Sequence, residues 1–402
     1  MTGGTIQMPE GQELSVRRRW WRQLRFLPLV ILAVLCLVAL ITGRVTAAHL
    51  AEQAATIAPV STDRPAADPV SRVCRPPVAA PDQQPWLTDR ASAEAEWSRN
   101  APGAAERQVV GPNGWIFWSD YVDQYASQAV GRDLLTDVQI KQWVTHLTEV
   151  RDQLAQRGIP LYVIVTPSTS SIYPEELPTW MQRLRGSTIM DQFVASVGNL
   201  PVMDLRQDLI DQKGGPAHLF SWSNSHWTEY GAYVAWKQIA ACTNAMDPGA
   251  KPLQVPAIDG TTVTGDFNEW APYGIASPGA DWAVPNFTDP MMPVTRTDKS
   301  GATEVVPGST VTDLSVLPTT TAVSTPWTGK SALIFRDSMG GGLSPMWQQA
   351  YSPTWQVDEP YITGTIKSSN FAQLVDEHKP DVVIVQLAER YLLNAPPQSA
   401  GY

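Results

Sequence analysis

Apolar residues follow a helical period in some parts of the chain and form short continuous runs in others. After Thr136, apolar side chains recur every three or four residues as far as Leu154, and Gly158 follows soon afterwards. A capping threonine, this spacing and a terminal glycine together predict an amphipathic helix. The same reasoning predicts further helices at residues 187–198, at 228–244, after Gly342 and at 370–378.

Short apolar runs rich in β-branched residues lie between these helices and are typical of strands buried on both faces of a parallel sheet. They comprise residues 161–165, 201–205, 331–336 and 381–387. A Pro-Asn-Gly turn within residues 109–118 predicts a hairpin before them. Because helices and strands alternate, the sequence predicts an α/β fold with three α/β/α layers and a mainly parallel sheet.

Residues 247–330 interrupt this alternation. They are rich in Pro, Thr, Gly and Asp and contain only short β-like fragments. The sequence therefore predicts an insertion of loops and hairpins within the α/β domain.

An uncharged apolar segment lies near the start of the chain, between Arg25 and Arg44. As a helix, residues 26–43 would reach about 27 Å, which is enough to cross the hydrocarbon core of a bilayer. Several arginines precede the segment and one follows it, so the positive-inside bias predicts a cytoplasmic tail, residues 1–25, and an exported remainder. The alternative is a cleaved signal peptide, because residues 45–47 resemble a cleavage site.

The rest of the chain divides into a spacer and a folded body. Residues 44–105 begin with an Ala- and Pro-rich stretch without a sustained apolar period, which suits a stalk that lifts a domain off the membrane. Residues 106–402 hold the alternating helices and strands and form the predicted globular domain.

Charge is distributed unevenly along the chain, whose net value is −10. The six arginines of residues 1–44 outnumber Glu10 and Glu13 by four, so the remainder carries −14. A body this acidic is unsuited to bind nucleic acid or an anionic surface through bulk charge. With 43% hydrophobic residues, the chain also has ample material for a core, which excludes a disordered protein.

The three cysteines have different settings. Cys36 lies within the apolar segment, where it serves as a small apolar residue. Cys74 and Cys242 are the two remaining thiols, and in an oxidising compartment we expect them to form a disulfide, the alternative being two unpaired thiols. The spacing of Cys and His resembles no metal site, and no cofactor is expected.

The first candidate site follows the predicted strand at 331–336. Reactive side chains gather where the strands of an α/β sheet end, and a serine on such a turn is exposed beside backbone N–H groups that can face an oxyanion. Ser338 has this position, and the alternative is an ordinary helix cap. The candidate residues for an oxyanion site or its lining are Arg336, Asp337, Met339, Gly340, Tyr173 and Trp227.

The second candidate site is a loop-to-helix junction at His226. This histidine could deprotonate a serine hydroxyl, and Asn224, two residues earlier, could orient the imidazole ring. The other four histidines lie in settings that do not suggest catalysis. The alternative is a structural histidine.

Five motifs, in this order, resemble the SGNH-hydrolase-like domain of the alginate O-acetylation proteins AlgX and AlgJ and of related exported polysaccharide O-acetyltransferases. They are Gly-Pro-Asn-Gly-Trp-Ile-Phe (111–117), Pro-Ser with Ile-Tyr-Pro-Glu-Glu-Leu-Pro (167–178), His-Trp-Thr-Glu-Tyr-Gly-Ala (226–232), Arg-Asp-Ser (336–338) and Pro-Asp-Val-Val-Ile-Val to Glu-Arg (380–390). The resemblance covers roughly residues 109–245 and 331–395.

The resemblance implies that Ser338 is a nucleophile and His226 its general base. The family has an aspartate where this chain has Asn224. In serine proteases, the same exchange costs about 10⁴ in turnover because the histidine adopts the wrong tautomer. Three outcomes follow from this departure: a slow or differently tuned enzyme, a substitute carboxylate such as Glu389 or Asp337, or an inactive relative.

The resemblance also implies a reaction. Ser338 would take an acetyl group from a donor and pass it, through an acyl-enzyme, to a hydroxyl of a cell-surface polysaccharide. The donor would come from a separate, multi-spanning membrane acyltransferase, since acetyl-CoA is absent outside the cell. The alternatives are a glycan acetyl-esterase and a non-catalytic glycan-binding or scaffold protein, and the many tryptophans either stack on sugars or fill the core.

Overall fold

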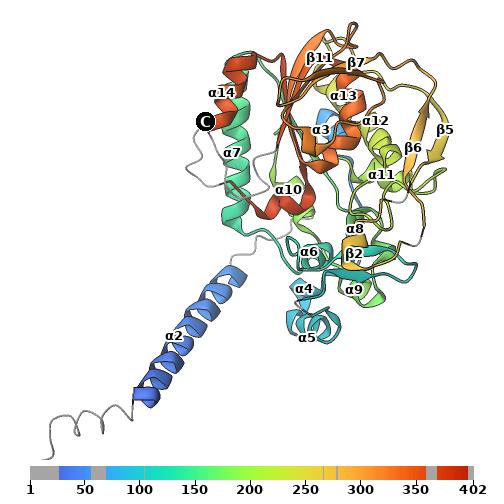
Figure 1. The fold of residues 1–402 in the computed structure, drawn as a ribbon. Helices are drawn as coiled ribbons and strands as arrows, with labels where there is room; N and C mark the ends of the chain where they lie inside the picture. Colours follow the sequence, from blue (N-terminus) through green and yellow to red (C-terminus); the bar gives the residue numbers. More distant parts are fainter. Residues whose placement is uncertain are drawn as a thin grey trace, which may run out of the picture. The chain divides into compact units, whose positions relative to one another are not determined.

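The computed structural model describes residues 27–55, 69–103, 105–265, 267–277, 279–358 and 369–396. The chain divides into two compact units, residues 1–57 and 58–402, which are described separately. Figure 1 shows the fold, coloured along the sequence.

The first unit contains one long helix, α2 (Leu27–Ala55). Its first 18 residues, Leu27–Arg44, are long and apolar enough to cross a membrane. This window agrees with the apolar segment predicted at residues 26–43, whereas the basic tail at 1–25 lies outside the described residues. Residues 45–47, the alternative cleavage site, continue the same helix.

The second unit is built on a sheet of eight strands in the order β4-β3-β12-β10-β11-β9-β7-β8. The first five strands of this order run parallel to one another, and the last three join through antiparallel pairs. The parallel strands are β4 (Val202–Asp204), β3 (Leu161–Thr166), β12 (Val382–Ala388), β10 (Lys330–Arg336) and β11 (Tyr351–Asp358). The predicted α/β fold is confirmed, with a mixed sheet whose central part is parallel.

Alternating side chains of each central strand enter two separate cores. In β3, Val163 and Val165 face one core and Tyr162 and Ile164 face the other. The first core is closed by helices α7 (Asp137–Ala155), α10 (Ile189–Ser196) and α14 (Ser369–His378). The second is closed mainly by α12 (Glu229–Met246) and α13 (Ser344–Ala350), so helices cover both faces of the sheet (Figure 1).

Helix α7 illustrates how local sequence fixes an element. The Thr136 side chain accepts the Gln139 N–H, and the Gln139 side chain accepts the Thr136 N–H in return, which forms a capping box. Trp143, Leu147 and Leu154 lie on its buried face, as their spacing predicts. The other predicted helices and strands are also present, with boundaries that differ by a few residues.

The inserted segment contributes more to the sheet than the sequence predicts. Strands β7 (Val294–Thr297), β8 (Thr303–Val306) and β9 (Thr319–Ala322) extend the main sheet beyond β11. A separate hairpin is formed by β5 (Ile258–Val263) and β6 (Ala283–Phe287). These strands are short and mostly polar, so their sequence lacks the apolar pattern that marks the central strands.

The folded body begins earlier than the predicted boundary at residue 106. Residues 69–100, assigned from sequence to the stalk, form the short helices α3 (Pro69–Cys74), α4 (Pro85–Thr88) and α5 (Arg90–Asn100). Trp86 and Trp97 are buried and belong to the same core as α12, so this Ala-rich stretch packs onto the folded body. Residues 56–68 of the expected stalk lie outside the described residues.

A disulfide between Cys74 and Cys242 fastens α3 to α12, as predicted, with the two Cα atoms 4.7 Å apart. Cys36 is a free, exposed thiol on α2. The remaining short elements of the second unit are β1 (Gln108–Val110), β2 (Ile116–Trp118), α6 (Tyr125–Val130), α8 (Thr169–Ile172), η1 (Pro174–Glu176), α9 (Thr179–Leu184), α11 (Arg206–Asp211), η2 (Ala271–Tyr273), η3 (Leu314–Val316), η4 (Ser338–Leu343) and η5 (Glu389–Leu393).

Candidate active site

The serine turn follows strand β10 directly. Asp337 caps η4: its Oδ1 accepts the Met339 N–H at 2.8 Å and the Gln386 Nε2 group at 2.9 Å. Its Oδ2 accepts the Ala388 N–H at 2.6 Å. Asp337 therefore ties the carboxyl end of β10 to that of β12 and fixes the point at which Ser338 leaves the sheet.

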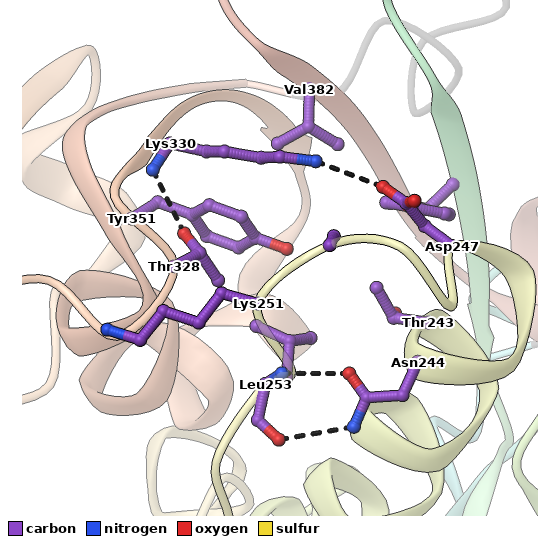
Figure 2. Close-up of a pocket in the computed structure, with 11 residues that line it drawn as sticks. Thr243, Asn244, Asp247, Lys251, Leu253, Thr328, Lys330, Tyr351 and Val382 are labelled. Atoms are coloured by element: carbon purple, nitrogen blue, oxygen red, sulfur yellow. Dashed lines mark hydrogen bonds and ion pairs between the residues drawn. The ribbon is translucent and has the colours of Figure 1, made fainter.

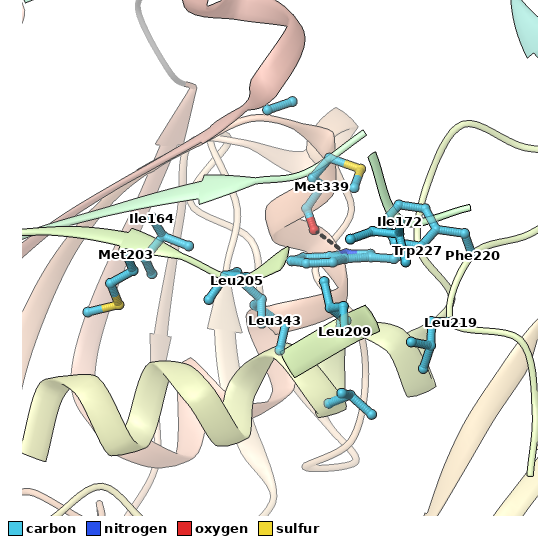
Figure 3. Packing of buried hydrophobic residues seen from close by; sticks show 14 of the residues in the cluster. Ile164, Ile172, Met203, Leu205, Leu209, Leu219, Phe220, Trp227, Met339 and Leu343 are labelled. Atoms are coloured by element: carbon cyan, nitrogen blue, oxygen red, sulfur yellow. Dashed lines mark hydrogen bonds between the residues drawn. The ribbon is translucent and has the colours of Figure 1, made fainter. Parts of the chain in front are cut away.

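A second turn brings His226 to the same edge. Thr228 caps α12 by accepting the Gly231 N–H at 3.1 Å, so His226 lies just before the helix begins. Trp227 is buried, and its indole N–H donates to the Met339 carbonyl at 2.9 Å, as the dashed line in Figure 3 shows. This bond joins the histidine turn to the serine turn.

Ser338, His226 and Asn224 form a continuous hydrogen-bonded row. His226 Nε2 lies 2.7 Å from Ser338 Oγ, although 112 residues separate the two in the sequence. On the other side of the ring, His226 Nδ1 lies 2.7 Å from Asn224 Oδ1. The structure thus brings together the three residues that the sequence analysis assigned to catalysis, in the order of a serine hydrolase triad.

The orientation of the Asn224 amide follows from its other two partners. Asn224 Nδ2 donates to the Phe267 carbonyl at 2.7 Å, and Oδ1 accepts the His226 backbone N–H at 3.0 Å. A carbonyl can only accept and a backbone N–H can only donate, so the amide oxygen faces the imidazole. The ring proton therefore lies on Nδ1, and Nε2 presents its lone pair to the Ser338 hydroxyl.

Neither substitute carboxylate considered from the sequence hydrogen bonds with His226. Glu389 accepts the Ser168 N–H at 2.9 Å and the Ser171 hydroxyl at 2.7 Å. Both oxygens of Asp337 are occupied by the serine turn and by β12, as described above. These two carboxylates stabilise the ends of the strands.

A carboxylate that the sequence analysis did not consider lies beside the histidine turn. Glu269, in the inserted segment, accepts the Ser225 N–H at 2.7 Å through Oε2. Its Oε1 accepts the Ser225 hydroxyl and the Trp118 indole N–H, each at 3.2 Å. Nothing in the local sequence distinguishes Glu269 from other acidic residues of the insertion, and only the replacement of aspartate by Asn224 indicated that a carboxylate was missing.

The electrostatic surroundings keep the His226 ring neutral near pH 7. Burial lowers the pKa of His226 below its ordinary 6.5, and the nearby Arg390 acts in the same direction. The Glu269 carboxylate opposes this shift of the pKa more strongly than any other charge, followed on the same side by Asp337 and Asp313. A neutral imidazole is the form that can take a proton from a hydroxyl.

Two of the candidate lining residues prove to be structural. Arg336 is fully buried; its guanidinium donates to Gln356 Oε1 at 2.9 Å and to the Thr312 carbonyl at 2.6 Å, and burial lowers its pKa to about 10. The Tyr173 hydroxyl accepts the Leu219 N–H at 3.1 Å, and burial raises its pKa to about 12. These contacts tie both polar groups to the scaffold.

The backbone N–H groups after Ser338 are also occupied. The Met339 N–H donates to Asp337 Oδ1, and the Gly340 N–H donates to the Asp337 carbonyl at 3.2 Å. The Ser338 N–H, at the first position of η4, has no hydrogen-bond partner within the described part of the chain. It is therefore the backbone donor next to Ser338 Oγ that remains for an oxyanion.

Two of the three glycines of the serine turn, Gly340 and Gly342, are required by packing. A Cβ atom on Gly340 would lie 2.6 Å from Arg336 Cδ, and one on Gly342 would lie 2.8 Å from the Ala232 methyl group and 3.1 Å from Trp227 Nε1. Gly340 and Gly342 therefore let the turn pack closely on α12 and the sheet.

A small cavity lies at the opposite end of the sheet, at the amino ends of the parallel strands (Figure 2). It is lined by Tyr162, Tyr351 and the ion pair of Lys330 with Asp247, whose Nζ–Oδ2 distance is 3.0 Å. Its volume of about 20 Å³ corresponds to roughly one water molecule. Among the described residues, no group of three or more His, Cys, Asp or Glu side chains could hold a metal ion.

Comparisons of sequence find a similar family and a similar relative. Residues 109–290 match the family described as "SGNH hydrolase-like domain, acetyltransferase AlgX". The chain is 29% identical over 135 residues to a probable alginate O-acetylase AlgJ from Azotobacter vinelandii. That match covers 33% of this chain and 32% of the relative, so it spans about one third of the relative's length.

Comparisons of structure agree on the fold. PatB1 from Bacillus cereus matches with a TM-score of 0.51 at 13% identity, over 71% of this chain and 96% of that one. A DHHW family protein from Eubacterium siraeum matches with a TM-score of 0.50 at 14% identity, over 75% and 95% of the two chains. Residues 109–290 are thus similar to the SGNH hydrolase-like domain of AlgX, and the solved structures share the fold of the second unit.

Proposed function

We propose that this protein is an extracytoplasmic O-acetyltransferase that modifies a hydroxyl of a cell-surface polysaccharide through a Ser338 acyl-enzyme. The observation that carries the proposal is the 2.7 Å contact between Ser338 Oγ and His226 Nε2, with the ring proton held on Nδ1 by Asn224. A serine with a neutral imidazole in this tautomer is prepared for nucleophilic attack.

In the first half-reaction, His226 Nε2 takes the hydroxyl proton as Ser338 Oγ attacks the acetyl carbonyl of the donor. The tetrahedral oxyanion that forms is stabilised by the Ser338 N–H. When it collapses, the bond to the donor's leaving oxygen breaks and His226 returns the proton to that oxygen. The products are acetyl-Ser338 and the deacetylated donor.

In the second half-reaction, a sugar hydroxyl enters beside His226. The ring takes the proton of this hydroxyl as its oxygen attacks the acetyl-serine carbonyl. When the intermediate collapses, the bond between Ser338 Oγ and the acetyl carbon breaks and His226 returns the proton to Oγ, which leaves the sugar ester and free Ser338. No step requires a metal or another cofactor. The AlgJ relative, whose name describes an alginate O-acetylase, supports a polysaccharide as the acceptor.

The proposal includes a location and a partner. The apolar window of α2 would anchor the chain in the cell membrane as a single span, with the tail at residues 1–25 in the cytoplasm and the catalytic domain outside. One span cannot form a path for an acetyl group across the bilayer. A separate multi-spanning acyltransferase would therefore supply the donor on the outer side.

The test uses the detergent-solubilised full chain with an activated acetyl ester and a panel of oligosaccharides. Mass spectrometry should find an acetyl group on Ser338 and then on the sugar, and Ser338→Ala should show neither. Release of acetate without any sugar ester would identify an esterase. A chain that forms no acyl-enzyme would contradict the proposal and support a glycan-binding role.

A further inference from the structure

We infer that the inserted segment takes over the role of the aspartate that Asn224 replaces. The Phe267 carbonyl positions the amide of Asn224, and the Glu269 carboxylate supplies the negative charge. Glu269 is thus a positioning residue that acts on His226 through Ser225. The inference rests on the proposed function, because it assigns this role within the same site.

A triad carboxylate has two separate tasks. It holds the histidine in the tautomer with a proton on Nδ1, and it stabilises the positive ring that forms when the serine loses its proton. An asparagine can perform the first task only when its oxygen faces the ring. It cannot perform the second, because an amide carries no charge.

The inserted segment helps with the first task, which is to hold His226 in the tautomer with a proton on Nδ1. The His226 backbone N–H, which donates to Asn224 Oδ1 at 3.0 Å, opposes a turn of the amide that would point its NH₂ group toward the ring, and the insertion adds a second restraint. The Phe267 carbonyl, 2.7 Å from Asn224 Nδ2, accepts that NH₂ group and leaves Oδ1 for the imidazole. Because this contact comes from the backbone of residue 267, it depends on where the insertion places its chain.

The position of that chain is fixed by further hydrogen bonds between the insertion and the histidine turn. The Glu269 N–H donates to the Ser223 carbonyl at 3.0 Å, while the Glu269 side chain accepts both the N–H and the hydroxyl of Ser225. Residues 267–269 are thereby paired with residues 223–225, immediately before His226. The Trp118 indole holds the same carboxylate from β2.

The second task requires a negative charge that acts on the ring, and Glu269, which hydrogen bonds to Ser225 next to His226, supplies it. Its three partners, the Ser225 N–H, the Ser225 hydroxyl and the Trp118 indole, all act as donors toward it, as suits an ionised carboxylate. Of the charges that act on His226, Glu269 raises its pKa most. Asp337, beside the serine, and Asp313, just before η3, also raise the pKa of His226, whereas Arg390 on η5 lowers that pKa.

The experiment measures the histidine directly, by ¹⁵N nuclear magnetic resonance of the full chain labelled at histidine, with His226 assigned through His226→Gln. In the unaltered protein, the spectrum should show the neutral ring protonated on Nδ1. Glu269→Gln should shift the titration of His226 to lower pH and reduce turnover of an activated acetyl ester about 10- to 100-fold. Glu304→Gln, in the same insertion but in an exposed ion pair with Arg296, should change neither.

A second variant separates a charge effect from a loss of structure. Adding Asn224→Asp to Glu269→Gln restores a negative charge next to the ring, so the double variant should recover both the titration and most of the turnover. If Glu269 only held the loop in place through its hydrogen bonds, a charge on residue 224 would restore neither the titration of His226 nor the turnover. Failure of this rescue, or an unchanged His226 titration in Glu269→Gln, would overturn the inference.

The same readouts distinguish this inference from the proposed function. If no variant forms an acyl-enzyme but the titration of His226 still shifts with Glu269→Gln and returns with Asn224→Asp, the proposed activity fails and the assignment of Glu269 stands. If acyl transfer occurs and Glu269→Gln changes neither the titration nor the rate, the activity stands and the inference fails.

Discussion

Trp227 and Met339 are joined by a hydrogen bond of 2.9 Å that links the turn bearing the histidine to the turn bearing the serine. The indole donates to the first carbonyl after Ser338, and its ring packs among buried side chains of both segments (Figure 3). The distance between Ser338 Oγ and His226 Nε2 therefore depends on a contact made by neither residue.

Replacing Trp227 by Phe should reveal this dependence. The variant keeps an aromatic ring in the core but removes the N–H, so the Met339 carbonyl loses its partner and the free energy of unfolding should fall by about 1–2 kcal/mol. We expect acyl transfer to fall further, by about tenfold, since the two turns are no longer held in register. Denaturant unfolding and turnover on the same preparation check both values; an equal, small effect on each would contradict the positioning role.

Ser338→Ala should remove activity by at least about a thousandfold while the fold persists. The Ser338 side chain is partly exposed and makes its one described side-chain contact with His226, so its loss leaves only the part-buried His226 Nε2 without this partner. The free energy of unfolding should change by less than about 0.5 kcal/mol. Turnover that survives in this variant would show that another residue is the nucleophile.

The dependence of activity on pH follows from the pKa of His226. Only the neutral ring can accept the Ser338 proton, so kcat/KM should fall as the pH drops through the pKa of His226 and the ring becomes charged. Because burial lowers that pKa, the midpoint should lie below 6.5 and the enzyme should keep most of its activity at pH 7. A pH profile of kcat/KM tests this, and a midpoint above 7 would mean that nearby carboxylates outweigh the burial.

The bond between Cys74 and Cys242 closes a long loop, since 168 positions separate the two residues. Replacing both by Ser should lower the free energy of unfolding by up to about 5 kcal/mol on the chain-entropy estimate. The reduced and alkylated protein should behave like the double variant. Alkylation of both cysteines in the unreduced protein would exclude the bond.

The central fold could be predicted from the sequence because its elements carry strong local patterns. The capping threonine and apolar spacing of residues 136–154 belong to α7, and the apolar run at 161–165 belongs to β3. That β7 to β9 extend the main sheet was not predicted, because β7 and β8 form a short local hairpin with little apolar pattern and β9 pairs with β11, which follows β10 in the sequence. Their structure depends on the edge that β11 offers them and is not encoded in their own pattern.

The candidate site was predictable to a similar extent. Ser338 and His226 lie at junctions that the sequence identifies, and the resemblance to a known family specified their roles. Glu269 could not be found in this way, because its role arises from the path of the insertion. The sequence alone suggested Glu389 and Asp337 as substitute carboxylates, but both are occupied by contacts at the ends of the strands.

The single variant Asn224→Asp tests how completely the site has adapted to an amide. An aspartate would add charge beside His226, but one of its oxygens would face the Phe267 carbonyl, which now accepts the Asn224 NH₂ group at 2.7 Å. Two acceptors in contact repel each other, so the loop at residues 267–269 must shift and part of the gain is lost. With the tautomer already correct and Glu269 nearby, we expect the rate of acetyl-ester turnover to rise by less than about tenfold, or about 1.4 kcal/mol. The titration of His226 should nevertheless move to higher pH, because the added charge favours the positive ring. An increase approaching the factor of 10⁴ known from serine proteases would show that the amide had left the ring in the wrong tautomer and that the contact with Phe267 does not hold it.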